Sequence, residues 1–168
     1  MADIAIGWAV RHAASGRALV SDLVAPAPPD ARAFAEPAAD RVAAALADAL
    51  SDHAGPVLLV APDVPRLDDD LAAAALGDLA AGCALSFAPA TDSRPYLLAL
   101  AETSPQSLAL VGARDRHREA VFAAAMELGG DVGLLRSERR VVTPQDARAL
   151  AIDPLVPAEL RTLAGGFI

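Results

Sequence analysis

The chain has 168 residues, the size of one globular domain, and its 54% hydrophobic content excludes a chain that is disordered throughout. Its formal net charge of −8 disfavours general nucleic-acid binding, because an acidic surface repels phosphate backbones. Cys83 is the only cysteine, which excludes an intramolecular disulfide and a cysteine-based zinc cluster.

All 14 basic residues are arginine, which together with the abundant alanine indicates a GC-rich bacterial genome. The first residues carry an acid and no basic stretch, so we expect no signal peptide. No apolar run approaches the ~20 residues of a membrane helix. We therefore expect a soluble cytoplasmic protein, a single domain over residues 1–168, without a nucleic-acid or membrane partner.

The first half of the chain contains two apolar runs that are typical of buried strands. Ile4–Val10 is the first, and a polar loop over Arg11–Arg17 follows it. Residues 18–25 are ambiguous, and Pro37–Ser51 has the apolar spacing of an amphipathic helix. Val57–Ala61 lacks polar alternation, which predicts a strand in the middle of a mostly parallel sheet.

The second half alternates between the two periodicities. We predict helices over 68–81, 116–128 and 143–151, strands over 84–88, 96–100 and 132–135, and a weakly patterned tail over 153–168. This alternation favours an α/β fold, a three-layer α/β/α sandwich with a mostly parallel sheet.

Three segments carry a family resemblance through their order along the chain. They are Val-Leu-Leu-Val-Ala-Pro-Asp-Val-Pro at 57–65, Thr-Asp-Ser-Arg-Pro-Tyr-Leu-Leu at 91–98 and Arg-Val-Val-Thr-Pro-Gln-Asp at 140–146. Over about two thirds of the chain this order resembles a bacterial glycosyltransferase-A-like family related to phospholactate guanylyltransferases and molybdenum-cofactor nucleotidyltransferases. The resemblance implies a Rossmann-like glycosyltransferase-A fold and a transferase that binds a nucleotide or nucleotide-sugar with Mg²⁺ or Mn²⁺.

The chain departs from the family pattern at several positions. The phosphate-binding loop near the N-terminus lacks the usual lysine. Ser93 and Arg94 stand where the family has two glycines, and Arg140 and Val142 stand where it has acids. Each change removes a charge that the family uses there, or removes room for the backbone to approach a ligand.

Two acids are the candidate catalytic residues. Asp63 follows the strand at 57–61, and ligands of open α/β sheets bind at the carboxyl ends of strands. The resemblance makes Asp63 the metal ligand as well, since Mg²⁺ takes one or two protein carboxylates plus phosphate oxygens. Asp92 is the second candidate. The alternative for both is an acid satisfied within its own turn.

The candidate nucleotide-binding residues are basic or small. Arginine forks bind phosphate oxygens bidentately, and the resemblance places the phosphates near the first loop. The set is Arg11, Ser15, Gly16, Arg17 and Arg140. For each arginine the alternative is a solvated surface side chain. His12 is an acid–base candidate by residue type.

Two functions therefore stand side by side. The first is a nucleotidyl- or glycosyltransferase-like protein that acts on a small phosphorylated ligand or nucleotide-sugar with a divalent metal. The second is a catalytically degenerate relative, a pseudoenzyme that keeps the fold as a ligand- or partner-binding module. The sequence is compatible with a homo-oligomer and leaves enzymatic activity open.

Overall fold

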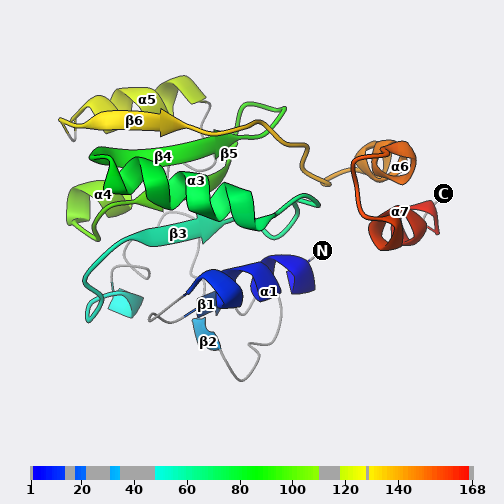
Figure 1. Ribbon diagram of the computed structural model, residues 1–168, viewed down its shortest axis with the longest axis horizontal. Helices are drawn as coiled ribbons and strands as arrows, with labels where there is room; N and C mark the ends of the chain where they lie inside the picture. The colour runs from blue at the N-terminus through cyan, green and yellow to red at the C-terminus, as the bar shows by residue number, and fades with distance from the viewer. Residues whose placement is uncertain are drawn as a thin grey trace.

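The computed structural model describes residues 2–13, 18–21, 31–34, 48–109, 118–127 and 129–166. Its centre is a four-stranded sheet in the order β3-β5-β4-β6 (Figure 1). The strands are β3 (Val57–Val60), β4 (Cys83–Pro89), β5 (Pro95–Leu100) and β6 (Asp131–Leu134). The predicted mixed α/β class is confirmed.

The strand directions differ from the expected mostly parallel pairing. β3, β4 and β6 run in one direction, but β5 runs in the opposite direction and lies between β3 and β4. The β3–β5 and β4–β5 pairs are therefore antiparallel, and only the β4–β6 pair of this sheet is parallel. Within the described part of the chain β3 pairs on one side only, so its expected central position is wrong.

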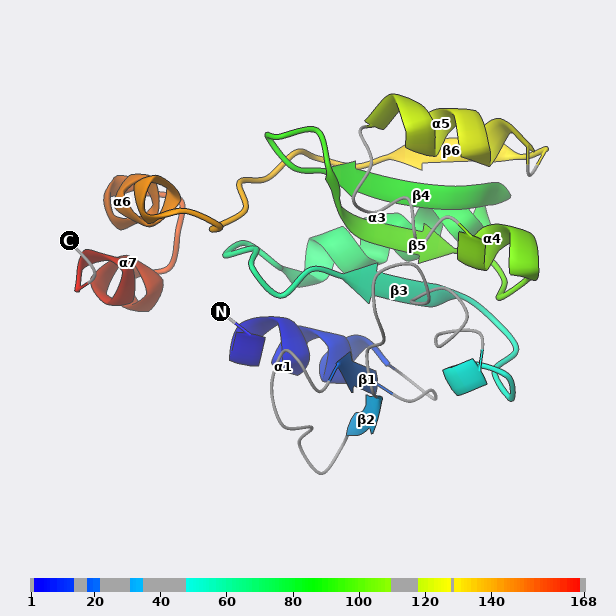
Figure 2. The same cartoon turned by 180° about the vertical axis from the view of Figure 1, so that it is seen from behind.

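Helices pack on both faces of the sheet. α3 (Asp69–Ala80) covers the face that carries Ala88, Leu97 and Ala99. α4 (Pro105–Ala109) and α5 (Arg118–Glu127) cover the opposite face, as the view from behind shows (Figure 2). That second face buries Leu85, Phe87, Leu98 and Leu100 against Leu108 and Ala125. The strands at 84–88 and 96–100 are mostly apolar because both of their faces are buried.

Local signals explain where several helices begin. Asp68 is the N-cap of α3, and its carboxylate accepts a hydrogen bond of 3.0 Å from the amide of Leu71. Thr143 begins α6 (Pro144–Ile152) with a full capping box to Asp146. The predicted helices at 68–81 and 143–151 are confirmed with a shift of one residue at each end. The helix predicted at 116–128 is confirmed over 118–127, and its predicted ends lie outside the described residues.

The N-terminal prediction is wrong. Ile4–Val10 belongs to helix α1 (Ala2–His12) rather than to a strand. Ala5 and Trp8, three residues apart, are its buried side chains, which is the spacing of one helix face. Trp8 is 1% exposed and donates its indole N–H to the carbonyl of Asp68 at 2.8 Å. A strand would place these two side chains on opposite faces.

Three further elements complete the described chain. β1 (Ala18–Ser21) and β2 (Ala31–Phe34) form a separate parallel pair. The tail forms helix α7 (Ala158–Gly165), which packs on α6. The helix expected over Pro37–Ser51 lies mostly outside the described residues. None of the helices in the described ranges is long and apolar enough to cross a bilayer.

The carboxylate of Asp78, a residue of α3, packs against β4 and β6. The Ser86 hydroxyl, buried within β4, donates a 2.5 Å hydrogen bond to its carboxylate. A Cβ added at Gly133 of β6 would overlap that carboxylate and lie 2.6 Å from the Ser86 oxygen. Only glycine leaves room for this contact.

Candidate functional site

The candidate site lies where β3 and β4 end. Three segments meet there: the turn after β3 that contains Asp63, the β4–β5 hairpin over 90–94, and the extended segment 135–143 that follows β6. We call this last segment the strap. It runs beside the hairpin, since Thr91 donates its amide to the Glu138 carbonyl at 3.0 Å and Ala90 forms a parallel bridge with Glu138.

Asp63 and Arg140 are in direct contact. Nε of Arg140 lies 2.9 and 3.0 Å from the two carboxylate oxygens of Asp63, and Nη2 lies 2.8 Å from Oδ2. The two side chains are 23% and 20% exposed. The Val141 amide also donates to the Asp63 carbonyl at 2.8 Å. A guanidinium fork on a carboxylate is the strongest common geometry for an ion pair.

This pairing bears on the expected metal site. A divalent cation at Asp63 requires open access to a carboxylate oxygen and few positive charges nearby. Here both oxygens accept hydrogen bonds from a guanidinium, whose charge repels a cation. Across the ranges that the structure describes, no three His, Cys, Asp or Glu side chains are grouped so that they could hold a metal ion. As arranged, the residues around Asp63 do not fit a divalent metal.

Asp92 is exposed at the tip of the β4–β5 hairpin. Its carboxylate accepts a 3.1 Å hydrogen bond from the Arg94 amide, and the Ser93 amide donates to the Ala90 carbonyl at 2.9 Å. Ser93 has φ 68°, the left-handed conformation that glycine adopts most readily. Asp92 is therefore satisfied within its own turn, the alternative that its position in the sequence left open.

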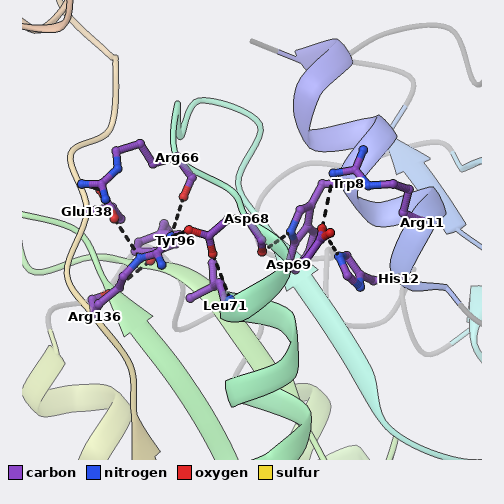
Figure 3. A network of polar contacts seen from close by, with 10 residues as sticks. All are labelled: Trp8, Arg11, His12, Arg66, Asp68, Asp69, Leu71, Tyr96, Arg136 and Glu138. Atoms are coloured by element: carbon purple, nitrogen blue, oxygen red, sulfur yellow. Dashed lines mark hydrogen bonds and ion pairs between the residues drawn. The ribbon is translucent and has the colours of Figure 1, made fainter. Parts of the chain in front are cut away.

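A second network of charged residues lies at the same edge of the sheet (Figure 3). Arg136 donates from Nε to Glu138 at 2.9 Å, and its Nη2 contacts Asp68 at 2.7 Å and the Arg66 carbonyl at 3.1 Å. Arg66 lies 3.5 Å from the other oxygen of Glu138, which is only 6% exposed. The Tyr96 hydroxyl donates to the Arg136 carbonyl at 3.1 Å.

The network shifts the pKa values of Tyr96 and Asp68. Burial, followed by the negative charge of Glu138, raises the pKa of the Tyr96 phenol well above its ordinary value. For Asp68, burial opposes ionisation, but the hydrogen bonds from Arg136 and from the Leu71 amide outweigh it and lower the pKa. Arg136 and the Leu71 amide thus favour the ionised form of Asp68.

Sequence reasoning missed this network. Arg66 and Glu138 are 72 positions apart, and their contact depends on the path of the strap across the sheet edge. The available signal was the run of charges at 136–140 directly after a strand, because a charged segment at the carboxyl edge of a sheet needs partners there.

The remaining candidates lie nearer the N-terminus. Arg11 is on α1, 59% exposed, with Nη2 3.7 Å from Asp69, and His12 makes a 3.0 Å contact with the same carboxylate oxygen (Figure 3). The His12 ring also packs on Trp8 with a centroid distance of 4.9 Å. These contacts join α1 to the start of α3. Ser15, Gly16 and Arg17 lie outside the described residues.

The structure thus brings together only part of the predicted site. Asp63 and Arg140 lie together, but they form an ion pair with each other. Asp92 contacts Arg94, and Arg11 contacts Asp69 rather than this pair.

Comparisons with known proteins identify the fold. No protein-family model matches the sequence, and no curated protein sequence is significantly similar to it. A crystal structure from Desulfovibrio desulfuricans, of a protein provisionally named a nucleotide-diphospho-sugar transferase, matches with a TM-score of 0.65 and 18% sequence identity. The match covers 96% of this chain and 78% of that one. The chain therefore has a glycosyltransferase-A-like fold, similar to that of a nucleotide-diphospho-sugar transferase.

Proposed function

We propose that this chain is a three-layer glycosyltransferase-A-type domain that acts as a binding module and does not perform metal-assisted transfer. The observation that carries the proposal is the bidentate ion pair between Asp63 and Arg140. It uses the carboxylate that the family resemblance assigns to the metal, and its partner stands at a position where the resemblance expects an acid.

The other residues of the sheet edge support the same conclusion. Val142, where the resemblance expects a second acid, is an apolar side chain that is 66% exposed. Arg66 and Arg136 could attract phosphate, but both contact Glu138, and Arg136 also contacts Asp68. The described charges at this edge therefore largely neutralise one another, which weakens the field that would draw in a pyrophosphate.

Nucleotide-sugar transfer is the second candidate, and the fold likeness over 96% of the chain favours it. Catalysis of this type would depend on positioning and electrostatics rather than on a covalent step. For Asp63 to hold Mg²⁺ or Mn²⁺, it would first have to exchange Arg140 for the cation. The two candidate functions therefore differ in one prediction: only the transferase binds a ligand in a way that depends on a metal ion.

Titration calorimetry separates them. UDP-glucose and GDP-mannose would be titrated, with and without Mn²⁺, into the wild type, Asp63→Asn and the control Asp52→Asn. Asp52 is an exposed acid in the turn before β3. We expect no heat that depends on Mn²⁺ in any of the three proteins. A Mn²⁺-dependent heat that Asp63→Asn abolishes and Asp52→Asn retains would overturn the proposal in favour of the transferase.

A further inference from the structure

The C-terminal helical pair α6–α7 stands apart from the sheet (Figures 1 and 2). The two helices pack mainly on each other. They share a small apolar cluster formed by Leu150, Val156, Leu160 and Ala164. Ile4 of α1 and Val141 of the strap, both only partly buried, pack against this cluster. The pair thus has a core of its own and little apolar area in contact with the rest of the molecule.

The strap connects this helical pair to the sheet in two stages. Its first half extends the sheet edge, since Leu135 donates its amide to the Phe87 carbonyl at 2.9 Å and Glu138 donates to Pro89 at 3.3 Å. Its second half is fixed to the turn after β3 by two contacts of Asp63: the side-chain fork of Arg140 and the Val141 amide.

Helix α6 begins directly after these contacts and needs nothing from the sheet in order to form. Its N-cap, Thr143, and the third helical residue, Asp146, satisfy each other's backbone amides. The capping box and the apolar cluster of α6–α7 would both persist if the strap came away from Asp63. The helical pair can therefore move as one unit.

We propose that the Asp63–Arg140 ion pair is a latch that holds the α6–α7 pair against the sheet edge. When the latch opens, the strap pivots between Glu138 and Thr143, and the helices swing away together while the sheet stays folded. Segments with few apolar contacts are the ones that open locally in this way. Salt weakens the latch because both side chains are partly exposed to solvent.

This inference uses the same ion pair as the proposed function but has a different readout, because it concerns how the helices are held and not what the site binds. The test is amide hydrogen exchange on the full chain, resolved by peptide, for Arg140→Gln, Asp63→Asn and the double variant. Arg148→Gln is the matched control, since Arg148 is an exposed arginine of α6 with no ion pair among the described side chains.

We expect amides of α6 and α7 to exchange about five- to tenfold faster in Arg140→Gln and Asp63→Asn, with β4 and β5 unchanged. The double variant should match the singles, because either substitution alone opens the latch. In the wild type, raising NaCl should accelerate exchange in the same two helices. Rates equal to those of Arg148→Gln would overturn the proposal. Equal acceleration in β4 and β5 would also overturn the proposal, because it would show that the ion pair stabilises the whole fold rather than the position of the two helices.

Discussion

Replacing Glu138 with glutamine tests whether the charged network at the sheet edge is structural. The side chain is 6% exposed, and its two oxygens face Nε of Arg136 at 2.9 Å and Nη1 of Arg66 at 3.5 Å. Glutamine keeps the shape and one acceptor oxygen. It removes the negative charge and turns an N–H donor toward a guanidinium that has only donors.

The magnitude follows from the burial of the three partners. Hydrogen bonds to charged groups contribute about 1.5–3 kcal/mol, and removing one member of a fully buried pair costs about 3–5 kcal/mol. Arg136 and Arg66 are 34% and 31% exposed, so water compensates part of this loss. We expect Glu138→Gln to lower the free energy of unfolding by about 2 kcal/mol.

The assay is urea unfolding followed by circular dichroism, with Glu127→Gln as the control. Glu127 is an exposed acid of α5, so its substitution should change stability by less than about 0.5 kcal/mol. If Glu138→Gln behaved like that control, the network would not support the fold. Glu138 would then not hold Arg66 and Arg136 in place, and the argument that this sheet edge does not attract a pyrophosphate would fail.

Three further predictions concern packing, capping and titration. Gly133→Ala should cost about 1–3 kcal/mol in urea unfolding, because the new methyl group displaces the Asp78 carboxylate from its hydrogen bond; a neutral result would show that the carboxylate has another position. Thr143→Ala should destabilise α6 by about 1 kcal/mol, whereas Thr143→Ser should not, and equal losses would contradict the capping assignment. The single tyrosine, Tyr96, has a pKa raised above 10.0, so its stabilising contribution is present below pH 10 and is lost as pH rises further. Its ultraviolet titration should lag behind that of the urea-unfolded chain, and superimposable curves would refute its burial.

The elements from residue 57 onward were largely predictable because their signals are local. Asp68 and Thr143 are N-caps, and an N-cap is read from a few neighbouring residues. The apolar runs at 84–88 and 96–100 became strands because both of their faces are buried. The direction of β5 was also available in the sequence, since seven residues between these two runs are too few for a parallel crossover.

The strand predicted over Ile4–Val10 was wrong because the local signal is ambiguous. A short apolar run is compatible with both a strand and a helix, and length alone did not decide between them. The positions of Ala5 and Trp8 favoured a helix, but their burial depends on α3, whose Asp68 carbonyl accepts the indole N–H.

The candidate site was predicted in position but not in chemistry. The carboxyl ends of strands do gather Asp63, the hairpin with Asp92 and the strap. What Asp63 contacts depends on a residue 77 positions away, and no local pattern encodes that pairing. The resemblance implies a metal ion at Asp63, whereas in the structure the Asp63 carboxylate forms an ion pair with Arg140.

The strand order has a consequence for how this protein is made. β5 pairs with both β3 and β4, and both of them precede it in the chain. During translation these two strands leave the ribosome before the strand that joins them in the finished sheet. Synthesis proceeds at about 5–20 residues per second, so β3 waits for roughly 40 residues, or several seconds, with its pairing edge open. In that interval the nascent chain exposes a hydrogen-bonding edge. A chaperone that binds this edge would compete with other chains that pair with it and aggregate.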